Sequence, residues 1–300
     1  MKKYKKYLFP ALIAAFAIIF LVSAGFLIDY FVDSKKQADQ YDDLADLMNQ
    51  GQQGQLSDQE INDYLDDYYW SDSEYNPEDD GSLNTPELPD HDPSLPEFYT
   101  IRNPDTGELM DVLREFALLF PKNTDLAGWI TVEGTDVNYP VLQSPDRPNY
   151  YLTRNFYKEN SRHGAIYANE TADLDYPSDN VTLYGHKMQD GSMFASLHKY
   201  KDPNFFKEHP YITFNTLTER HTYKIISVFT TCADPGKGFA YHAFVDGDAQ
   251  TFADFVAECK RLSLYDTRVE AIYGDKLLTL STCEHSINNG RFVVVAKRVS

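Results

Sequence analysis

Cysteine is scarce in this sequence: Cys232, Cys259 and Cys283 are the only three among 300 residues. An odd number cannot pair completely, so an exported chain of this composition keeps a free thiol that needs an explanation. Spacings of the CxxC or HExxH type are absent, and so are glycine-rich loops that would hold a phosphate. The sequence therefore predicts no metal site and no nucleotide site.

Basic residues are also few, 27 against 46 acidic ones, and the acidic excess is concentrated in one region. Residues 29–99 contain 20 Asp or Glu and two Lys, which leaves residues 100–300 with a net charge of about −5. Binding to phosphate backbones requires a basic face. The charge distribution argues against nucleic acid as a partner.

Charge is missing altogether from residues 8–28. At about 1.5 Å per residue, a helix of this length spans roughly 30 Å, the thickness of a bilayer core. Four lysines precede it, which predicts that residues 1–7 are cytoplasmic and that the rest of the chain is extracellular. Val22-Ser23-Ala24 resembles a signal-peptide cleavage site. Because the apolar run continues to Ile28, we expect an uncleaved single-pass anchor in the lipid bilayer.

The acidic region after the anchor, residues 29–97, reads as a largely disordered extracellular spacer with short helices. Residues 71–97 are rich in Asp, Glu, Ser and Pro, a composition that does not bury a core. Ser57-Asp58-Gln59-Glu60 matches the capping box that begins a helix. We expect the folded domain to occupy residues 98–300.

The folded domain is predicted to be mainly β with helices. Strands are expected at 128–132, 139–143, 164–168, 181–185, 211–215, 222–231, 277–282 and 292–295. Residues 248–263 carry apolar side chains at helical spacing, and residues 109–120 show a similar amphipathic face. Many short strands with turns between them predict a β-barrel or sandwich decorated by helices.

Cys283 lies where one strand ends and a polar loop begins, whereas Cys232 and Cys259 lie in apolar patterns typical of buried structural thiols. Arg291 begins the next strand, so antiparallel pairing would bring the thiol close to a guanidinium. Arginine does not lose its proton in proteins, and its possible role is donation to an oxyanion. A reactive thiolate also needs a partner that takes its proton.

Two histidines are candidates for the group that takes the proton of Cys283. His186 follows the apolar strand 181–185 and enters a glycine-containing loop, a position typical of catalytic groups. His285 lies two residues from Cys283 in the sequence. Considered singly, each residue also has a non-catalytic interpretation. Cys283 could be a buried structural thiol, either histidine a surface histidine, and Arg291 a surface arginine.

Taken together, these residues resemble a sortase. Thr279-Leu280-Ser281-Thr282-Cys283 resembles the Thr-Leu-x-Thr-Cys signature around the nucleophile of that family, and Arg291 falls where its arginine would. Segments similar to class B sortases lie at 149–155, 164–168 and 183–197. The resemblance covers roughly residues 108–300.

The resemblance implies a sortase-type eight-stranded β-barrel with N-terminal helices and a long helix before the cysteine strand. It also implies a transpeptidase in which Cys283 attacks the Thr carbonyl of a sorting motif. His186 would protonate the leaving amine and later deprotonate the incoming one. Arg291 would hold the substrate and its oxyanion, supported by Thr282 and by backbone N–H groups near Glu284.

The implied partners are secreted proteins that carry a C-terminal sorting motif of the form Asn-Pro-x-Thr. The acceptor would be a peptidoglycan amine or a pilin lysine, and no cofactor is implied. The chain itself contains Asn103-Pro104-Asp105-Thr106-Gly107, which is good turn chemistry and alternatively a pseudosubstrate. Two other functions remain: a thiol protease that hydrolyses surface peptides, and a non-catalytic binding module on a stalk.

Overall fold

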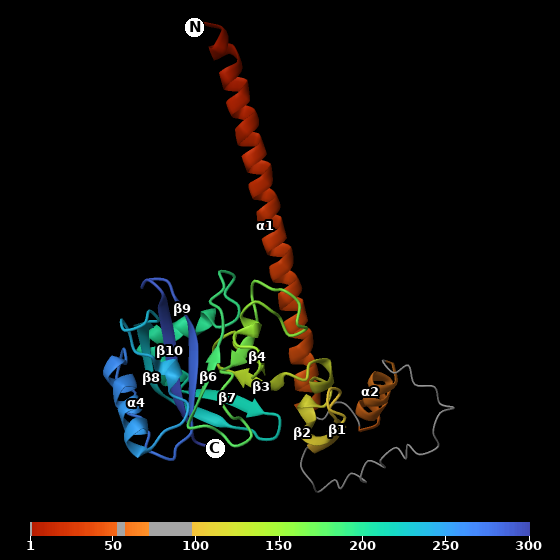
Figure 1. Cartoon of the computed structure of the whole chain (residues 1–300), viewed down its shortest axis with the longest axis vertical. Coiled ribbons are helices and arrows are strands. Elements are labelled where there is room, and N and C mark those ends of the chain that lie inside the picture. The colour runs from red at the N-terminus through yellow and green to blue at the C-terminus, as the bar shows by residue number, and fades with distance from the viewer. Residues whose placement is uncertain (1, 53–57, 72–97) are drawn as a thin grey trace. The chain divides into compact units, whose positions relative to one another are not determined.

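The computed structural model describes residues 2–52, 58–71 and 98–300 of the chain (Figure 1). The chain divides into two compact units, Met1–Asp43 and Leu44–Ser300. Helix α1 (Lys2–Gln52) begins in the first unit and ends in the second.

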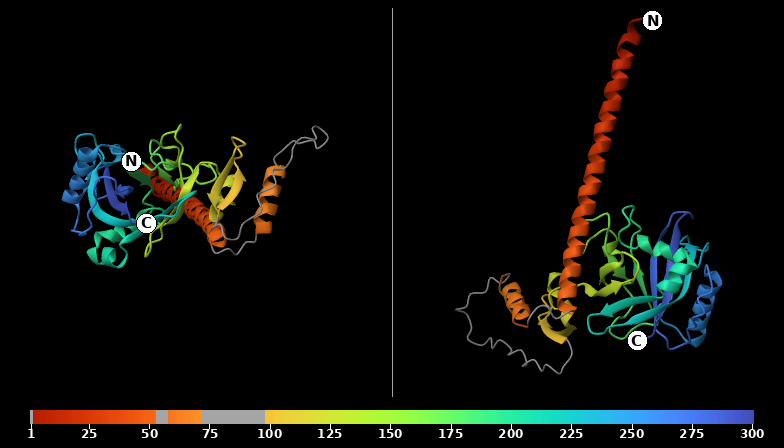
Figure 2. Two further views of the ribbon diagram at one scale, coloured as in Figure 1. Left: turned by 90° about the horizontal axis from the view of Figure 1, so that it is seen from below. Right: turned by 180° about the vertical axis from the view of Figure 1, so that it is seen from behind.

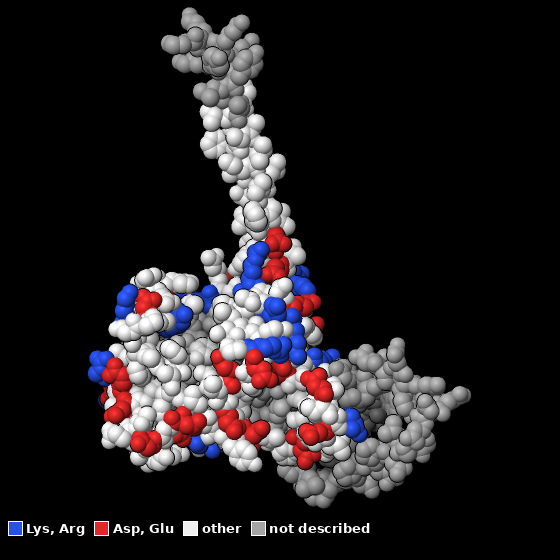
Figure 3. Space-filling model, viewed as in Figure 1, with Lys and Arg blue, Asp and Glu red and all other residues white. Residues whose placement is uncertain are grey.

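The first unit contains the apolar part of α1. By length and composition, the helical segment Leu12–Gln52, which begins in this unit, is a candidate membrane span. Large apolar side chains along it, including Phe16, Phe20 and Phe26, are more than two-thirds exposed. Residues 12–28 of this helix carry no charge, and the upper part of the helix is white in Figure 3. An apolar helix with this much exposed surface fits lipid as its surroundings.

The N-terminal part of the second unit is more helical than the predicted spacer. Leu44 and Met48 at the end of α1 are buried, as are Ile61 and Leu65 of α2 (Asp58–Ser71). These apolar side chains lie at helical spacing, which makes the two segments part of the compact unit. The compact unit therefore begins well before residue 98. The remainder of the predicted spacer, residues 53–57 and 72–97, lies outside the described residues.

The helix suggested by residues 109–120 is wrong at its beginning. Strand β1 (Phe98–Arg102) pairs antiparallel with β2 (Leu109–Leu113), and short 3-10 turns η1 (Arg114–Phe116) and η2 (Phe120–Lys122) follow. The Asn103–Gly107 segment causes this, because Gly107 N–H donates to the Asn103 carbonyl at 2.8 Å and turns the chain back on itself. The hairpin then pairs Leu109 with Arg102.

The barrel lies within residues 98–300, all of which are described. Its strands are β3 (Leu126–Thr131), β4 (Asn138–Leu142), β5 (Ile166–Ala168), β6 (Asn180–Tyr184), β7 (Tyr211–Thr216), β8 (Thr222–Cys232), β9 (Leu277–Glu284) and β10 (Gly290–Arg298). They close in the order β10-β8-β7-β3-β4-β5-β6-β9 (Figure 1). The β4–β5 and β6–β9 pairs are parallel and the others antiparallel. This confirms the predicted eight-stranded barrel.

The connections between strands carry the remaining helices. They are η3 (Tyr150–Leu152), η4 (Ala195–Lys201), α3 (Pro203–Glu208), η5 (Tyr241–Ala243) and α4 (Ala249–Leu262). Helix α4, the long helix before the cysteine strand, lies on the outside of the barrel (Figure 2). It packs through Phe252 and Cys259 onto β8 and β10. Burial raises the pKa of the Cys259 thiol, in keeping with the structural role expected for it.

Candidate active site

Cys283 and Arg291 are direct partners across one strand pair. In the antiparallel β9–β10 ladder, Arg291 is opposite Cys283, and Gly290 is opposite Glu284. Directly opposed residues on neighbouring strands have Cβ atoms about 4.5–5.5 Å apart. The apolar runs that form β9 and β10 thus place a thiol and a guanidinium together at the end of the ladder.

His186 reaches the same edge of the barrel through β6. This strand runs parallel to β9, with Tyr184 opposite Ser281, and Gly185 N–H donates to the Ser281 carbonyl at 3.1 Å. Neighbouring parallel strands end at the same edge of a sheet. His186 therefore leaves β6 beside the point where Cys283 ends β9.

The three residues line a single cavity of about 460 Å³. Its other walls include Tyr167, Tyr184 and Tyr241, the amides of Asn149, Asn169 and Asn289, and the carboxylate of Glu170. Burial is the main cause that raises the pKa of all three tyrosines, so their hydroxyl groups stay neutral hydrogen-bonding groups. The cavity combines aromatic walls with a few polar groups, as ligand-binding sites do.

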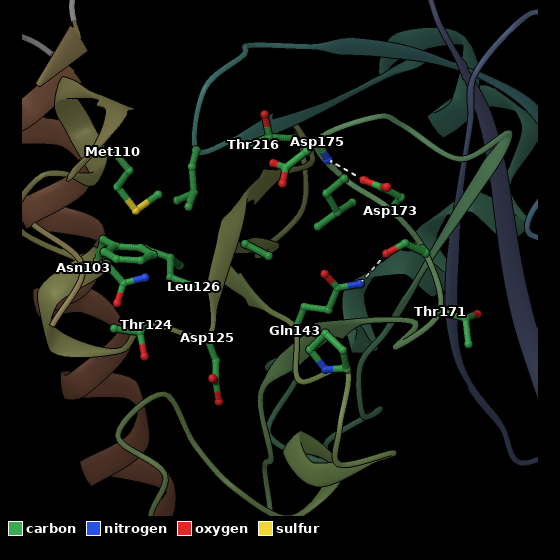
Figure 4. A pocket seen from close by; sticks show the side chains of 16 residues that line it. Asn103, Met110, Thr124, Asp125, Leu126, Gln143, Thr171, Asp173, Asp175 and Thr216 are labelled. Carbon is green, nitrogen blue, oxygen red and sulfur yellow. Dashed lines mark hydrogen bonds between the residues drawn. The ribbon is translucent and has the colours of Figure 1, made fainter. Parts of the chain in front are cut away.

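A larger cavity of about 600 Å³ lies elsewhere in the second unit (Figure 4). Its walls come from the β1–β2 hairpin, from β3 and the end of β7, and from the segments 143–145 and 171–175. Asp125 within it accepts hydrogen bonds from Tyr151 at 2.6 Å and Arg147 at 2.8 Å. None of the three predicted catalytic residues is among its lining residues. The smaller cavity is therefore the candidate active site.

The side chain of Arg291 is held by the loop before it. Its Nη1 lies 3.2 Å from Asn289 Oδ1 and 3.0 Å from the Gly290 carbonyl. Asn289 has a left-handed φ of 49° and donates from Nδ2 to Asp234 at 2.8 Å. Asn289 stands beside Asn288 and Gly290, a composition that indicates a turn and nothing more. The structure shows that it also orients the guanidinium.

Glu284 directs its carboxylate away from solvent, and its side chain is only 3% exposed. Burial acts to raise the pKa of Glu284, but hydrogen bonds from Lys201 and from Ser286 N–H outweigh it and lower the pKa to about 2. The carboxylate is thus a buried anion with its own partners. This leaves the backbone of Glu284, rather than its side chain, as the part available to a substrate.

The other proposed support, Thr282, is also part of the cavity wall. Thr282 is 2% exposed, and its Oγ1 is buried without a hydrogen-bond partner among the described residues. Successive side chains of a strand point to opposite faces. The hydroxyl of Thr282 therefore faces away from the side chain of Cys283.

His198 of η4 is a contact of Cys283 that sequence reasoning missed. Its Nε2 lies 3.1 Å from the Cys283 carbonyl, and its ring stacks on Phe292 with centroids 4.5 Å apart. Burial is the main cause that lowers the pKa of His198, and Lys187 and Lys201 lower it further. Because a carbonyl oxygen can only accept, the Nε2–H of His198 donates to it, and Nδ1 lies 3.5 Å from the Glu284 carboxylate. The contact spans 85 residues, and no local pattern signals it.

His285, the histidine that competes with His186 in the sequence, is exposed and is not among the residues that line the cavity. Besides His186, the cavity wall contains His242. Cys232 is half-buried opposite Gly290, and its Sγ lies 3.4 Å from the Asn288 carbonyl. Among the described residues, no group of three His, Cys, Asp or Glu is arranged to hold a metal ion.

Comparison with known proteins identifies relatives of this arrangement. The family model described as "Sortase domain" matches residues 130–299. Sortase B of Listeria monocytogenes is 35% identical over 196 residues, which cover 65% of this chain and 76% of that protein. Sortase B of Staphylococcus aureus is 34% identical over 185 residues, which cover 61% and 74% respectively.

Solved structures show the same likeness. The Staphylococcus aureus sortase B–substrate complex superimposes with a TM-score of 0.58 at 32% identity, covering 63% of this chain and 86% of that one. Sortase B from Bacillus anthracis in complex with AAEK1 gives a TM-score of 0.56 at 33% identity, covering 68% and 90%. The matched fold is the closed mixed barrel described above.

Proposed function

The chain belongs to the sortase family, and from this premise we propose that it is a membrane-anchored, class B cysteine transpeptidase for secreted proteins. The observation that carries the proposal is the meeting of Cys283, His186 and Arg291 in one cavity at the barrel edge. The three residues come from β9, from the end of β6 and from β10, which lie side by side in the barrel.

In the first half-reaction, the Cys283 Sγ–H bond breaks and the proton passes to His186. The thiolate attacks the Thr carbonyl carbon of the sorting motif, and the carbonyl oxygen becomes an oxyanion. Arg291 and a backbone N–H near Glu284 donate to that oxygen. The C–N bond then breaks, the leaving amine takes the proton from His186, and a thioester to Cys283 remains.

In the second half-reaction, the acceptor amine attacks the thioester carbon. His186 takes a proton from this amine as the C–N bond forms and the C–S bond breaks. The acceptor that we propose is a peptidoglycan amine or a pilin lysine. Both supply a primary amine, the nucleophile that this half-reaction needs.

The proposed substrate motif, Asn-Pro-x-Thr, rests on the likeness to class B sortases. One relative is described in complex with a substrate, and its structure superimposes on this chain. The internal Asn103–Gly107 segment has another role in the structure. It forms the β1–β2 turn, and Asn103 lines the larger cavity instead of the site. This placement favours turn formation over a pseudosubstrate.

The proposed location follows from α1. Its apolar stretch is long enough to cross a bilayer, and Lys2, Lys3, Lys5 and Lys6 precede it. We propose that these lysines stay in the cytoplasm and that the barrel is extracellular, because positive flanks are retained inside. Secreted substrates and a cell-wall acceptor are available on that side.

The test is incubation of the full chain in detergent with Asn-Pro-x-Thr peptides, with and without a primary amine. We expect a ligated product that depends on the amine, and a thioacyl adduct on Cys283 detectable by mass spectrometry. Cys283→Ala should abolish both, while Cys232→Ala serves as the matched control. Hydrolysis that is indifferent to the amine would indicate a thiol protease. Peptide binding without ligation or hydrolysis, unchanged in Cys283→Ala, would indicate a binding module.

A further inference from the structure

The imidazole of His186 is held by a backbone carbonyl. Its Nε2 lies 2.7 Å from the carbonyl oxygen of Leu152. A carbonyl oxygen has no hydrogen to give, so Nε2 must carry the proton and donate it. In a neutral imidazole this leaves Nδ1 as the unprotonated nitrogen. Nδ1 is then the atom able to accept a proton.

The Leu152 carbonyl is itself fixed by the chain around it. Leu152 ends the 3-10 turn η3, and its N–H donates to the Asn149 carbonyl at 3.0 Å. The returning segment closes on the turn, because Ala165 N–H donates to the Tyr151 carbonyl at 3.0 Å. Gly164 has a φ of +59°, and a Cβ added there would lie 2.7 Å from the Leu152 oxygen. The glycine leaves room for this carbonyl.

The segment that carries His186 is tied to the same region at a second point. Asp190 Oδ2 lies 3.0 Å from Nε2 of His163, which is 2% exposed and immediately precedes Gly164. Phe194 N–H donates to the His186 carbonyl at 2.9 Å and closes the loop between them. Two contacts therefore join the segment that carries the imidazole to the segment that carries the carbonyl: His186 to Leu152, and Asp190 to His163.

We propose that the Leu152 carbonyl is the positioning group of His186, in the place that a carboxylate takes in other nucleophile–histidine triads. Gly164 is the residue that permits this placement. The inference deepens the proposed function: the proton from Cys283 Sγ goes to Nδ1, and the imidazolium that forms keeps its Nε2–H bond to Leu152. A carbonyl acceptor stabilises that cation through its dipole and carries no charge of its own.

The first test measures the tautomer without any substrate. The full chain is labelled with 15N-histidine in detergent, and His186→Gln identifies the signal of His186. We expect Nε2 to be protonated and Nδ1 unprotonated while the imidazole is neutral. A protonated Nδ1 would overturn the proposal. This readout is independent of peptide ligation, so its failure and that of the proposed function are distinguishable.

The second test moves the carbonyl. Gly164→Ala presses a Cβ against Leu152, whereas Gly107→Ala creates the same positive-φ strain, at +74°, with no described atom within 4 Å. We expect Gly164→Ala to lower kcat for thioester formation at least tenfold, with KM little changed, and to shift the pH profile. Gly107→Ala should stay within twofold of the wild type.

An unchanged kcat in a folded Gly164→Ala variant would overturn the proposal, because the carbonyl would then not position His186. An increased kcat would also overturn it, because the carbonyl would then hold His186 in an unproductive position. Folding is checked by the melting temperature of both alanine variants. If Gly164→Ala does not fold, the tautomer measurement on the wild type decides the question alone.

Discussion

At the scale of single residues, the candidate site depends on groups behind the catalytic side chains. His198 holds the carbonyl of Cys283, Asn289 holds the guanidinium of Arg291, and the Leu152 carbonyl holds His186. Such partners keep reacting groups within the narrow range of positions that catalysis needs. The proposed nucleophile, base and cation are thus each fixed by a separate contact.

Glu284 gives the molecule an acid-sensitive contact next to the nucleophile. The pKa of this carboxyl falls from 4.5 to about 2 in the folded chain, so the folded state binds a proton less readily than the unfolded state. Its stabilising contribution is complete above about pH 4.5 and is lost as the pH falls from there toward 2.

We expect Glu284→Gln to lower the free energy of unfolding by about 1–3 kcal/mol at pH 7, with the difference shrinking as the pH approaches 2. The lower end reflects the ion-pair partner Lys201, whose side chain is 43% exposed. Urea unfolding at pH 7, 4.5 and 3 measures this. Glu258→Gln, at an exposed i,i+3 pair with Arg261, is the control. A pH-independent difference would contradict the assignment.

Cys283, Arg291 and His186 are predictable from sequence because each stands where an apolar strand pattern meets a polar loop. The partners of these residues are not. His198 and Cys283 are 85 positions apart, and the path of η4 that brings them together is set by tertiary packing. A histidine such as His198 carries no local sign that its ring will stack on Phe292 of β10.

At the scale of elements, α4 and the barrel strands follow their patterns, whereas β2 does not. Apolar residues at Val112, Leu113, Phe116 and Leu119 match helical spacing, yet the Asn103–Gly107 turn imposes a hairpin on the first part. Short apolar runs are ambiguous between helix and strand, and the turn beside them decides. The turn residues were the better guide to this segment.

Helix α4 should be important for stability and not for chemistry. Phe252 is fully buried against Phe244 and the β8–β10 face. We expect Phe252→Ala to lower the free energy of unfolding by about 3–5 kcal/mol through the cavity it leaves. Gln250→Ala, on the exposed side of the same helix, should change it little. Denaturant unfolding measures both.

The rate of Cys283 alkylation in folded protein should be alike in these two variants and in the wild type. A large change in thiol reactivity in Phe252→Ala, under conditions where the variant is folded, would show that α4 contributes to the site itself.

At the scale of the whole molecule, the charge pattern agrees with a barrel held at a membrane. The face of the barrel seen in Figure 3 carries acidic and basic residues interspersed, and the uncharged stretch belongs to α1. The extent of the compact unit was not predictable, because the helical segments within the acidic region bury only a few apolar residues each. Their partners lie far away in sequence.

The boundary of the compact unit can be tested by truncation. We expect residues 44–300 to form a soluble protein whose peptide kinetics are within twofold of the full chain. Residues 98–300 lack Leu44, Met48, Ile61 and Leu65, and a fully buried side chain of this kind contributes about 1.5–3 kcal/mol. The shorter protein should melt at a clearly lower temperature. Equal melting temperatures would place the boundary near residue 98.

The parallel pairing of β6 with β9 has a consequence for engineering. Because backbone ladders join β6, β9 and β10, the spacing of histidine, cysteine and arginine is set by adjacent strands. The long connection from β8 to β9, residues 233–276, contributes Ala233, Tyr241 and His242 to the cavity wall. Exchange of the side chains of Ala233 and His242 is therefore a route to new peptide specificity, provided that Asp234, which holds Asn289, and Tyr241, which hydrogen-bonds to Ser281, are kept.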